Sequence, residues 1–281
     1  MTTPIRLIDS AANIFSQMGE DGMIAKIFET MGVTNTWCVE FGAWNGTHYS
    51  NTCNLITNKG WSGVLIEADP QRFVELRTTY AANPKVIPVK AFVNFSGPDT
   101  LDNLLAKTAI PKSFDLLSID IDGNDYHIWD SLKKFQPRVV VIEFNPTIPA
   151  DIEFVQPKDM NVTQGSSLAA LVTLGTRKGY ELVAATFLNA FFVRREDFKR
   201  FAITDNSPAA LKQTSAETRL FQLYDGTVVL AGRNRLLWHD ITLRQRHVQI
   251  LPRMFRRHPD NMNPVQSFLF KVWRKLHNRY L

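Results

Sequence analysis

Two apolar patterns alternate along most of the chain. Short apolar cores such as VLI, LLSI and VVVI are typical of strands that are covered on both faces of a sheet. Between them lie tracts in which apolar residues recur at helical spacing. The predicted strands lie at residues 37–41, 61–70, 86–94, 114–122, 138–146, 180–186 and 189–196, and the predicted helices at 13–31, 51–57, 71–83, 99–108, 127–135 and 167–179. In the first helical tract the glycines of SQMGEDG count against an uninterrupted helix.

The order of these elements predicts the fold class. Strands that alternate with helices indicate βαβ units and a mostly parallel sheet. The last two predicted strands follow each other closely, so we expect them to form an antiparallel pair. The sequence therefore predicts an α/β protein with a doubly wound, mostly parallel seven-stranded sheet and helices on both of its faces.

A change of composition near residue 205 predicts a boundary. The tract ITDNSPAALKQTSAET has the composition of a linker or surface loop. We expect one domain at residues 1–205 and a C-terminal extension at 206–281. The extension contains a short hairpin-like segment, YDGTVVLAG, and ends in a basic amphipathic helix.

Composition and the N-terminal sequence predict the cellular location of the protein. Hydrophobic residues make up 44% of the 281 residues and charged residues 21%, which are ordinary values for a globular protein with a core. Two cysteines, Cys38 and Cys53, do not make a disulfide framework and are expected to be reduced thiols. The sequence shows neither a secretion signal nor an apolar run long enough to span a bilayer. We therefore expect a cytoplasmic protein.

Polar side chains stand at the carboxyl ends of four predicted strands. Ligands of open α/β sheets bind at this edge, near the point where the strand order reverses. Acids at all four strand ends favour a binding site over a set of solvated turns. The residues are Glu40 and Gly42 after the first strand, Glu67 and Asp69 after the second, Asp120 and Asp122 after the fourth, and Glu143 and Asn145 after the fifth.

The first strand leads into a glycine turn, CVEFGAWNG. A dinucleotide-binding turn carries G-x-G-x-x-G, and this tract lacks the close glycine pair that a pyrophosphate requires. With Glu40 just before it, the turn is better suited to a cationic or zwitterionic ligand. Glu67, at the end of the second strand, can accept both hydroxyls of a ribose. A ligand with a ribose, a positive charge and no phosphate describes S-adenosylmethionine.

Five tracts resemble the FkbM-like group of S-adenosylmethionine-dependent methyltransferases, which modify glycans and natural products. They lie within residues 14–146 and read SQMGEDGMIAKIF, VEFGAWNGTHYSNT, GWSGVLIEADP, LLSIDIDGNDYHIWDSL and VVVIEFNP. The resemblance implies a Rossmann-like class I methyltransferase fold. It assigns Ser16 and Gln17 to an upstream tract that closes over the cofactor, Glu40, Gly42 and Gly46 to the methionine part, Glu67 to the ribose, and Ala91 and Phe92 to the adenine.

The tract SIDIDGNDYHIW offers groups for the chemical step. A sulfonium methyl group is already activated, so the enzyme must align an acceptor and remove its proton. Asp120 and Asp122 alternate along a predicted strand and would point to opposite faces, but if the strand ends at Gly123 both carboxylates can converge. These two acids and His127 are the catalytic candidates, and His48 is a competing base. Asp120, Asp122, Glu143 and Asn145 form an all-oxygen set that suits Mg²⁺ or Mn²⁺.

Structural roles for the same residues remain open. Acids and asparagines at strand ends commonly cap the turns that follow, and Asp125 is placed to cap the helix that contains His127. A lone histidine near a helix start is more often structural than catalytic.

The C-terminal tail carries positive charge. From Leu243 onward there are nine Lys or Arg residues and one acid, against a net charge of +5 for the whole chain. In PVQSFLFKVWRKLHNRYL the apolar residues form one helical stripe opposite the charges. The helix could dock on its own domain or on a second subunit of a homo-oligomer. It could also lie on an anionic membrane surface, peripheral to the inner face, or contact a phosphate backbone. The absence of a recognisable RNA-binding module counts against nucleic acid.

Together these features predict an O-methyltransferase that uses S-adenosylmethionine, with or without a divalent metal, on a sugar hydroxyl of a glycan or glycosylated metabolite. An RNA methyltransferase and a non-catalytic interaction protein with the same fold are alternatives. A nicotinamide-dependent oxidoreductase is a further rival, and the missing G-x-G-x-x-G pattern counts against it.

Overall fold

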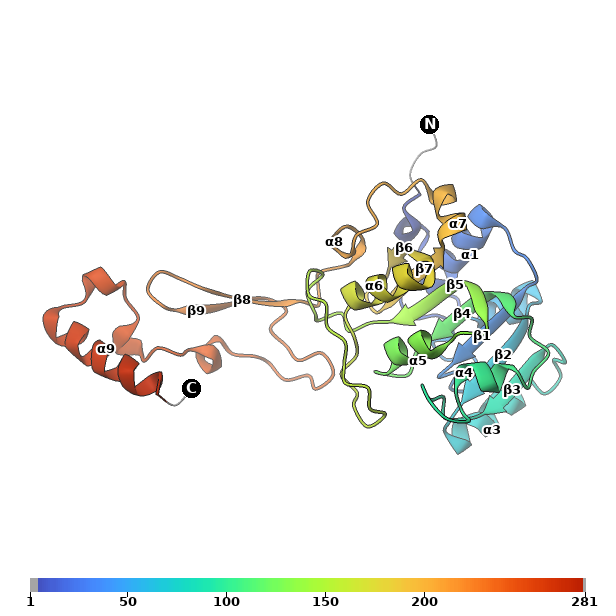
Figure 1. Cartoon of the computed structure of the whole chain (residues 1–281), viewed down its shortest axis with the longest axis horizontal. Helices are drawn as coiled ribbons and strands as arrows, with labels where there is room; N and C mark the ends of the chain where they lie inside the picture. Colours follow the sequence, from blue (N-terminus) through green and yellow to red (C-terminus); the bar gives the residue numbers. More distant parts are fainter. Residues whose placement is uncertain (1–4, 280–281) are drawn as a thin grey trace. The chain divides into compact units, whose positions relative to one another are not determined.

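The computed structural model describes residues 5–279, and Figure 1 shows the course of the chain. The chain divides into two compact units, Met1–Gln213 and Thr214–Leu281. The division falls after residue 213 rather than after 205, because the short helix α8 (Pro208–Leu211) packs against elements of the first unit. No helix among the described residues is long and apolar enough to cross a membrane.

The first unit is built on one seven-stranded sheet. The strands run in the order β3-β2-β1-β4-β5-β7-β6, in which β1 to β5 are parallel and β7 is antiparallel to both of its neighbours. This confirms the predicted Rossmann-like class I arrangement, and it places β7 between β5 and β6. The strands are β1 (Trp37–Phe41), β2 (Ser62–Glu67), β3 (Val86–Lys90), β4 (Ser113–Ile119), β5 (Gln136–Glu143), β6 (Tyr180–Ala185) and β7 (Asn189–Arg194).

Helices cover both faces of this sheet (Figure 1). Alternate strand residues face opposite sides, so Val39 and Phe41 enter one apolar core and Cys38 the other. Both cysteines are buried and free. The first core is completed by α4 (Leu101–Leu105), α5 (Asp125–Ser131) and α6 (Leu168–Lys178), and the second by α1 (Glu20–Met31), α2 (Cys53–Lys59) and α3 (Pro70–Thr79).

The tract at residues 13–31 is not one uninterrupted helix, as the glycines of SQMGEDG indicated, and its first third is a loop. The helix begins at Glu20, after Gly19 with a φ of +97°. The preceding residues form a loop because the Asp21 carboxylate accepts the N–H groups of Ile14, Phe15 and Ser16 at 2.7–2.8 Å. These bonds offer the backbone an alternative to the helix.

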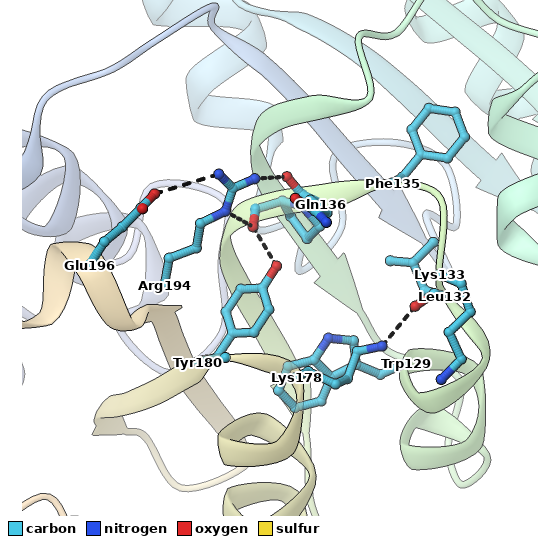
Figure 2. A pocket seen from close by; sticks show the side chains of 11 residues that line it. Trp129, Leu132, Lys133, Phe135, Gln136, Lys178, Tyr180, Arg194 and Glu196 are labelled. Atoms are coloured by element: carbon cyan, nitrogen blue, oxygen red, sulfur yellow. Dashed lines mark hydrogen bonds and ion pairs between the residues drawn. The ribbon is translucent and has the colours of Figure 1, made fainter.

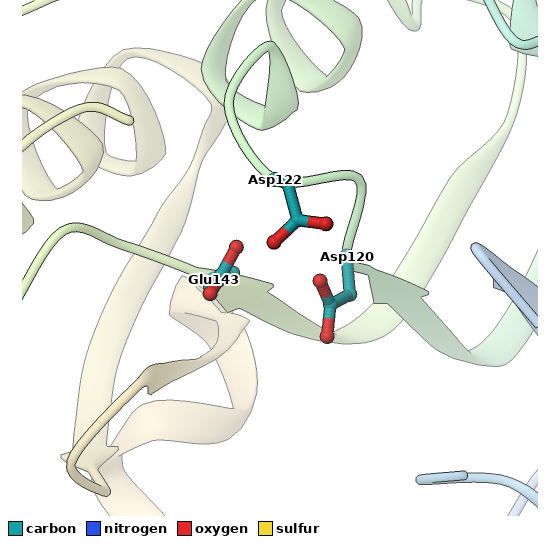
Figure 3. Close-up of side chains that lie close together, drawn as sticks. All are labelled: Asp120, Asp122 and Glu143. Carbon is teal, nitrogen blue, oxygen red and sulfur yellow. The ribbon is translucent and has the colours of Figure 1, made fainter. Parts of the chain in front are cut away.

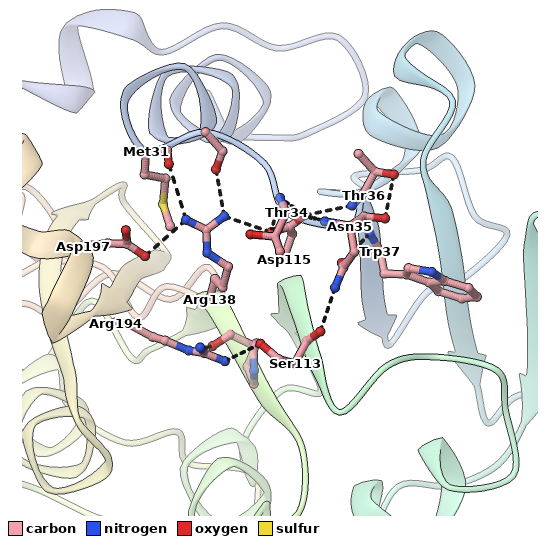
Figure 4. Close-up of polar contacts among 12 residues, drawn as sticks. Met31, Thr34, Asn35, Thr36, Trp37, Ser113, Asp115, Arg138, Arg194 and Asp197 are labelled. Atoms are coloured by element: carbon pink, nitrogen blue, oxygen red, sulfur yellow. Dashed lines mark hydrogen bonds and ion pairs between the residues drawn. The ribbon is translucent and has the colours of Figure 1, made fainter.

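An arginine fixes the amino ends of the central strands (Figure 4). The Arg138 guanidinium on β5 bonds Asp115 on β4 at 3.1 Å and Asp197 of α7 (Arg195–Phe198) at 3.2 Å. Asp115 is fully buried and also accepts the N–H groups of residues 34–36, just before β1. The acids at this edge of the sheet are therefore paired with a cation.

The second unit contains a two-stranded hairpin and a helix. Strands β8 (Thr218–Gln222) and β9 (Val228–Gly232) pair in antiparallel fashion, which agrees with the predicted hairpin-like segment. Helix α9 (Pro264–His277) begins at Asn263, which forms a capping box with Gln266. Short 3₁₀ helices lie between them: η3 (Gln245–Val248), η4 (Arg253–Phe255) and η5 (Pro259–Asn261). Tyr280, the last apolar residue of the predicted stripe, lies outside the described residues.

At their carboxyl ends, β1 and β4 approach each other so closely that only glycine fits. Gly42 follows β1 with a φ of +74°, and a Cβ atom there would lie 1.9 Å from the carbonyl oxygen of Asp120. The clash and the left-handed backbone are separate penalties.

A matched pair of glycine substitutions separates the two penalties. Gly97 has a φ of +77°, but a Cβ atom added there would meet nothing within 4 Å. We expect Gly97→Ala to lower the free energy of unfolding by about 1 kcal/mol, and Gly42→Ala to lower it by at least about 2 kcal/mol more, because the backbone of residue 120 must move. Denaturant unfolding of both variants measures the difference. Equal losses would contradict the close approach.

Candidate active site

The parallel register brings the carboxyl ends of β1, β2, β4 and β5 to one edge of the sheet. Phe41, the last residue of β1, pairs with Ile66 of β2 and with Ile119 of β4, and Ile119 pairs with Ile142 of β5. The residues that follow these four positions therefore share one edge. Glu67, Asp69, Asp120, Asp122 and Glu143 lie at or just beyond this edge, and Glu40 lies one residue before the end of β1.

The turn after β1 has an unusual backbone. Two non-glycine residues, Trp44 and Tyr49, have φ values of +51° and +53°, in the left-handed region. Gly46 packs against Tyr80, whose hydroxyl donates to the Gly46 carbonyl at 2.7 Å. A Cβ atom at residue 46 would lie 2.5 Å from the Tyr80 ring. The turn is therefore held in a strained shape by its surroundings, as is common in ligand-binding turns.

Glu40 holds the residues that follow this turn through hydrogen bonds. Its buried carboxylate accepts the hydroxyls of Ser50 and Thr52 and the N–H of Asn51 at 2.6–2.8 Å. Burial raises its pKa above the ordinary value of 4.5, while these hydrogen bonds lower it. Glu40 thus fixes the residues leading into α2, and its role at the cofactor stays a prediction.

Glu67 joins the turn to β2. It accepts the N–H of Trp44 on one carboxylate oxygen and that of Asp69 on the other, both at 2.7 Å. Each oxygen keeps a further lone pair, which a ribose hydroxyl could use. After β3, Ala91 donates its N–H to the Glu67 carbonyl at 3.2 Å, and Phe92 is 58% exposed.

The predicted upstream tract holds a buried acid with a free acceptor. Ser16 is buried and exchanges hydrogen bonds with Asp21, whereas the Gln17 side chain is exposed. Asp21 is 3% exposed, and its Oδ1 atom has no hydrogen-bond partner. Sequence reasoning missed Asp21, although two adjacent acids between glycines in SQMGEDG were a visible signal.

Three carboxylates converge at the ends of β4 and β5 (Figure 3). One oxygen from each of Asp120, Asp122 and Glu143 lies within 4.8 Å of the other two. Strand β4 ends at Ile119, and Asp122 adopts a φ of +56°, so the two aspartates do not alternate as strand residues would. Asp125 holds this bend by accepting the N–H groups of Ile121 and Gly123.

The crowding of these acids changes their protonation. Although the Asp120 side chain reaches solvent, surrounding protein atoms disfavour its charged form, and with nearby Asp125 and Asp122 they raise its pKa from 3.8 to about 7. Burial raises the pKa of Asp125 to about 6 and that of Glu143 well above its ordinary value. Ionising these carboxyl groups together therefore costs free energy at this edge of the sheet.

Two other predicted residues have partners elsewhere. The Asn145 side-chain oxygen accepts the N–H and hydroxyl of Thr147, so it is committed to its own loop. His127 is buried, and its Nε2 atom bonds the backbone carbonyl of Gln156 at 2.9 Å. Among the described residues, the close group of candidate metal ligands does not include His127. Its catalytic role stays a prediction.

Two more buried acceptors at this edge lack partners. The side-chain oxygen of Asn124 precedes α5, and that of Asn189 begins β7 opposite Glu143. With Asp21 Oδ1 they give three orphaned oxygens and no orphaned donor at this edge of the described structure. The edge is thus suited to a ligand that donates hydrogen bonds or carries positive charge.

The pKa of Asp120 predicts how stability changes with pH. Because its folded-state pKa is raised from 3.8 to about 7, the folded state binds more protons than the unfolded state, and stability falls as pH rises through that window. Asp120→Asn should therefore raise the free energy of unfolding. Because solvent screens this partly exposed site, we expect the increase at pH 8 to exceed the increase at pH 5 by on the order of 1 kcal/mol.

Denaturant unfolding at the two pH values measures this gain. The control is Asp151→Asn, which neutralises an exposed turn residue. A gain from Asp120→Asn that does not change with pH, or that the control reproduces, would contradict the proposed crowding.

One comparison with known proteins finds a family resemblance over part of the chain. A family model described as the methyltransferase FkbM domain matches residues 99–182. The match contains Asp120, Asp122 and Glu143 but not the glycine turn. No curated protein matches the chain significantly.

Solved structures share a general likeness. The N-terminal domain of EvdMO1 with SAH bound is 13% identical, and the match covers 64% of this chain and 82% of that one, with a TM-score of 0.43. The same domain in the presence of SAH and D-fucose is 13% identical, and the match covers 66% of this chain and 90% of that one, with a TM-score of 0.41. The precorrin-6y C5,15-methyltransferase from Geobacter metallireducens GS-15 is 16% identical, and the match covers 65% of this chain and 90% of that one, with a TM-score of 0.36. At these scores the likeness identifies no substrate. The matched segment, residues 99–182, is similar to the FkbM methyltransferase domain over less than a third of the chain, and it identifies the protein as an S-adenosylmethionine-dependent methyltransferase.

Proposed function

We propose that the protein transfers the methyl group of S-adenosylmethionine to a sugar hydroxyl of a glycan or glycosylated metabolite. A difference between the two edges of the sheet supports a cofactor site at the carboxyl edge. At the amino edge of the sheet, Asp115 and Asp197 are paired with Arg138. At the carboxyl edge, no ion pair of the described residues involves Asp120, Asp122 or Glu143. A cationic ligand supplies the missing charge.

The cofactor follows the strand ends in order. Glu67 accepts the ribose hydroxyls, and the Gly42 turn lies along the methionine part. The free oxygen of Asp21 is assigned to the ammonium group, because it is a buried, negatively charged acceptor without a donor. The exposed ring of Phe92, after β3, covers the adenine.

The acid group serves the acceptor. A sugar hydroxyl is a weak acid and needs a base, and Asp120 or Asp122 would take its proton. Asp120, Asp122 and Glu143 would hold a divalent cation, since three hard oxygens within 4.8 Å of one another suit Mg²⁺ or Mn²⁺. Such an ion would offset the repulsion among the carboxylates and make a bound hydroxyl more acidic. Asn145 is left out of this set, because Thr147 occupies its side-chain oxygen.

Aromatic side chains beside the turn offer a surface for a sugar ring. Trp44 and Tyr49 are 43% and 55% exposed, and the His48 ring contacts both, with ring centroids 5.5 Å from Trp44 and 3.9 Å from Tyr49. Arg72 stacks on Trp44 at 4.5 Å. Rigid aromatic faces with polar groups nearby suit the apolar faces and hydroxyls of a carbohydrate.

Glu67→Gln and Asp120→Asn test the two halves of the site. Glu67→Gln should weaken binding of S-adenosylhomocysteine about tenfold, because it removes a charged acceptor. Asp120→Asn should keep that binding and reduce turnover at least about 100-fold, because it removes a base. Calorimetry measures the first, and methyl transfer to a panel of free and lipid-linked sugars measures the second.

Each half has its own control. Glu75→Gln alters a carboxylate of α3 that pairs with Arg72 and should leave cofactor binding unchanged. Absence of S-adenosylhomocysteine binding would overturn the cofactor site. Full turnover in a chelator would remove the metal, and full turnover in both Asp120→Asn and Asp122→Asn would overturn the acceptor site.

We further propose that the second unit lies on an anionic membrane surface. Residues 214–281 contain twelve Lys or Arg residues and four acids, an excess of eight positive charges. Polybasic segments of this kind are attracted to anionic lipids. The charge therefore favours a lipid surface over a neutral protein partner.

Helix α9 divides its apolar residues between two faces. Phe270 and Trp273 pack on Phe255, with ring centroids 5.6 and 5.9 Å from it. The other face is open: its apolar side chains are 41–67% exposed and follow helical spacing, namely Val265, Phe268, Leu269, Val272 and Leu276. Lys271 and Lys275 flank this stripe. An exposed apolar stripe beside basic residues is typical of helices that lie in a membrane interface.

Vesicle sedimentation tests this surface. The full-length protein should bind phosphatidylserine vesicles and not pure phosphatidylcholine, and salt should weaken binding. Lys271→Gln and Lys275→Gln should each weaken it about fivefold, and Phe268→Gln with Val272→Gln should also weaken it. Leu220→Gln, an equally exposed apolar residue of β8, is the control. Failure to bind vesicles, or tighter binding to RNA at equal ionic strength, would overturn the lipid surface.

A further inference from the structure

A cavity lies at the edge of the sheet opposite the acid group of Asp120, Asp122 and Glu143 (Figure 2). It measures about 390 Å³ and lies between the end of α5, the start of β5 and the α6–β6 junction. Gln136 and Pro137 line it at the start of β5, whose last residue is Glu143. At about 3.3 Å per strand residue, the two sites are roughly 20 Å apart. The cavity is therefore separate from the methyl-transfer site.

The charged lining is mostly positive. Lys133, Lys178 and Arg194 line the cavity, with Glu196 as the opposing acid. Arg194 donates from Nε to the Pro137 carbonyl and from NH2 to Ser113 and to Gln136, and its NH1 atom lies 3.7 Å from Glu196. Arg194 thus contributes charge while its donors are largely used.

Lys178 retains unused donors. Its ammonium group donates to the Leu132 carbonyl at 2.7 Å, which uses one of its three hydrogens. Burial and the nearby positive charge of Lys133 lower its pKa to about 8, against the attraction of Asp130 and Asp102. A bound anion would relieve both effects.

Trp129 supplies a buried donor without a partner. Its side chain is fully buried against Tyr180 and Phe192, yet the indole Nε1 atom bonds nothing. In Figure 2 this nitrogen points toward the middle of the cavity, on the side of Lys178. An indole N–H can only donate. Leaving it unsatisfied is costly, so a ligand that fits here must bring an acceptor.

We propose that this cavity binds the oxyanion of a small molecule, a phosphate or a carboxylate. Two groups facing it keep unused donors, the indole N–H of Trp129 and the ammonium group of Lys178. The Lys133 ammonium adds positive charge, although it lies 3.8 Å from Asp130, and Glu196 is the one acid of the lining. The carbonyls of Leu132 and Pro137 already accept from Lys178, Tyr180 and Arg194. A site with spare donors, a positive excess and one apolar wall recognises an anion and rejects cations.

Titration of the full-length protein with inorganic phosphate tests the site. Calorimetry at constant ionic strength should show saturable binding to the wild type. Trp129→Phe, which keeps an aromatic ring but loses the donor, and Lys178→Gln should each weaken it about tenfold. Lys133→Gln alters an exposed side chain and should weaken binding without affecting folding. Acetate and sulfate, titrated in the same way, distinguish a carboxylate site from a phosphate site.

Lys134→Gln is the matched control, because this neighbouring lysine is exposed and does not line the cavity. It makes the same charge change as Lys133→Gln and should leave the affinity unchanged. Retained binding of S-adenosylhomocysteine shows that each variant is folded. Equal affinity in all variants would assign the phosphate to the basic second unit and overturn the proposal, as would the absence of saturable binding.

Discussion

The gathering of carboxylates at one edge of the sheet is the constraint on which the rest of the molecule depends. Within the described part of the chain no ion pair involves any of them. Glu20, Asp21, Glu40 and Asp125 accept hydrogen bonds from backbone, hydroxyl or amide donors, whereas the described residues supply none to the carboxylates of Asp120, Asp122 and Glu143. Burial, with mutual repulsion added, raises the pKa values of several members. A cationic ligand completes such an edge. The acids are Glu20, Asp21, Glu40, Asp120, Asp122, Asp125 and Glu143.

The two edges of the same sheet solve opposite electrostatic problems. At the amino edge, Arg138 pairs with Asp115 and Asp197, Arg200 adds a second cation beside Asp197, and Arg138 ties α1, β4 and β5 together. The carboxyl edge keeps unpaired acceptors, and the cavity lined by Lys178 and Trp129 keeps unpaired donors. Polar groups left unsatisfied in an otherwise well-bonded protein are the places where ligands of opposite character are expected.

Much of the architecture follows from local pattern. Continuous apolar cores gave the strands of the parallel sheet, and the glycines of CVEFGAWNG marked a turn that only Gly42 can make beside the Asp120 carbonyl. Strand ends then placed Asp120, Asp122 and Glu143 at one edge without any knowledge of contacts. Asn145 and His127 carried the same signals in sequence. Thr147 and the Gln156 carbonyl are their partners, and both come from the long segment between β5 and α6, whose path no local pattern predicts.

By itself the sequence determined the α/β class, the antiparallel final pair of strands and the edge at which the acids meet, because period and strand order depend on short-range sterics and burial. Tertiary structure alone decided that residues 14–16 bond Asp21 in a loop before the helix, that β7 lies between β5 and β6, and that Trp129, Lys178 and Arg194 share a cavity. These features depend on hydrogen bonds and packing between segments far apart in the chain. The energies of these contacts depend on which groups come together in space, and the spacing of residues along the sequence does not predict those pairings.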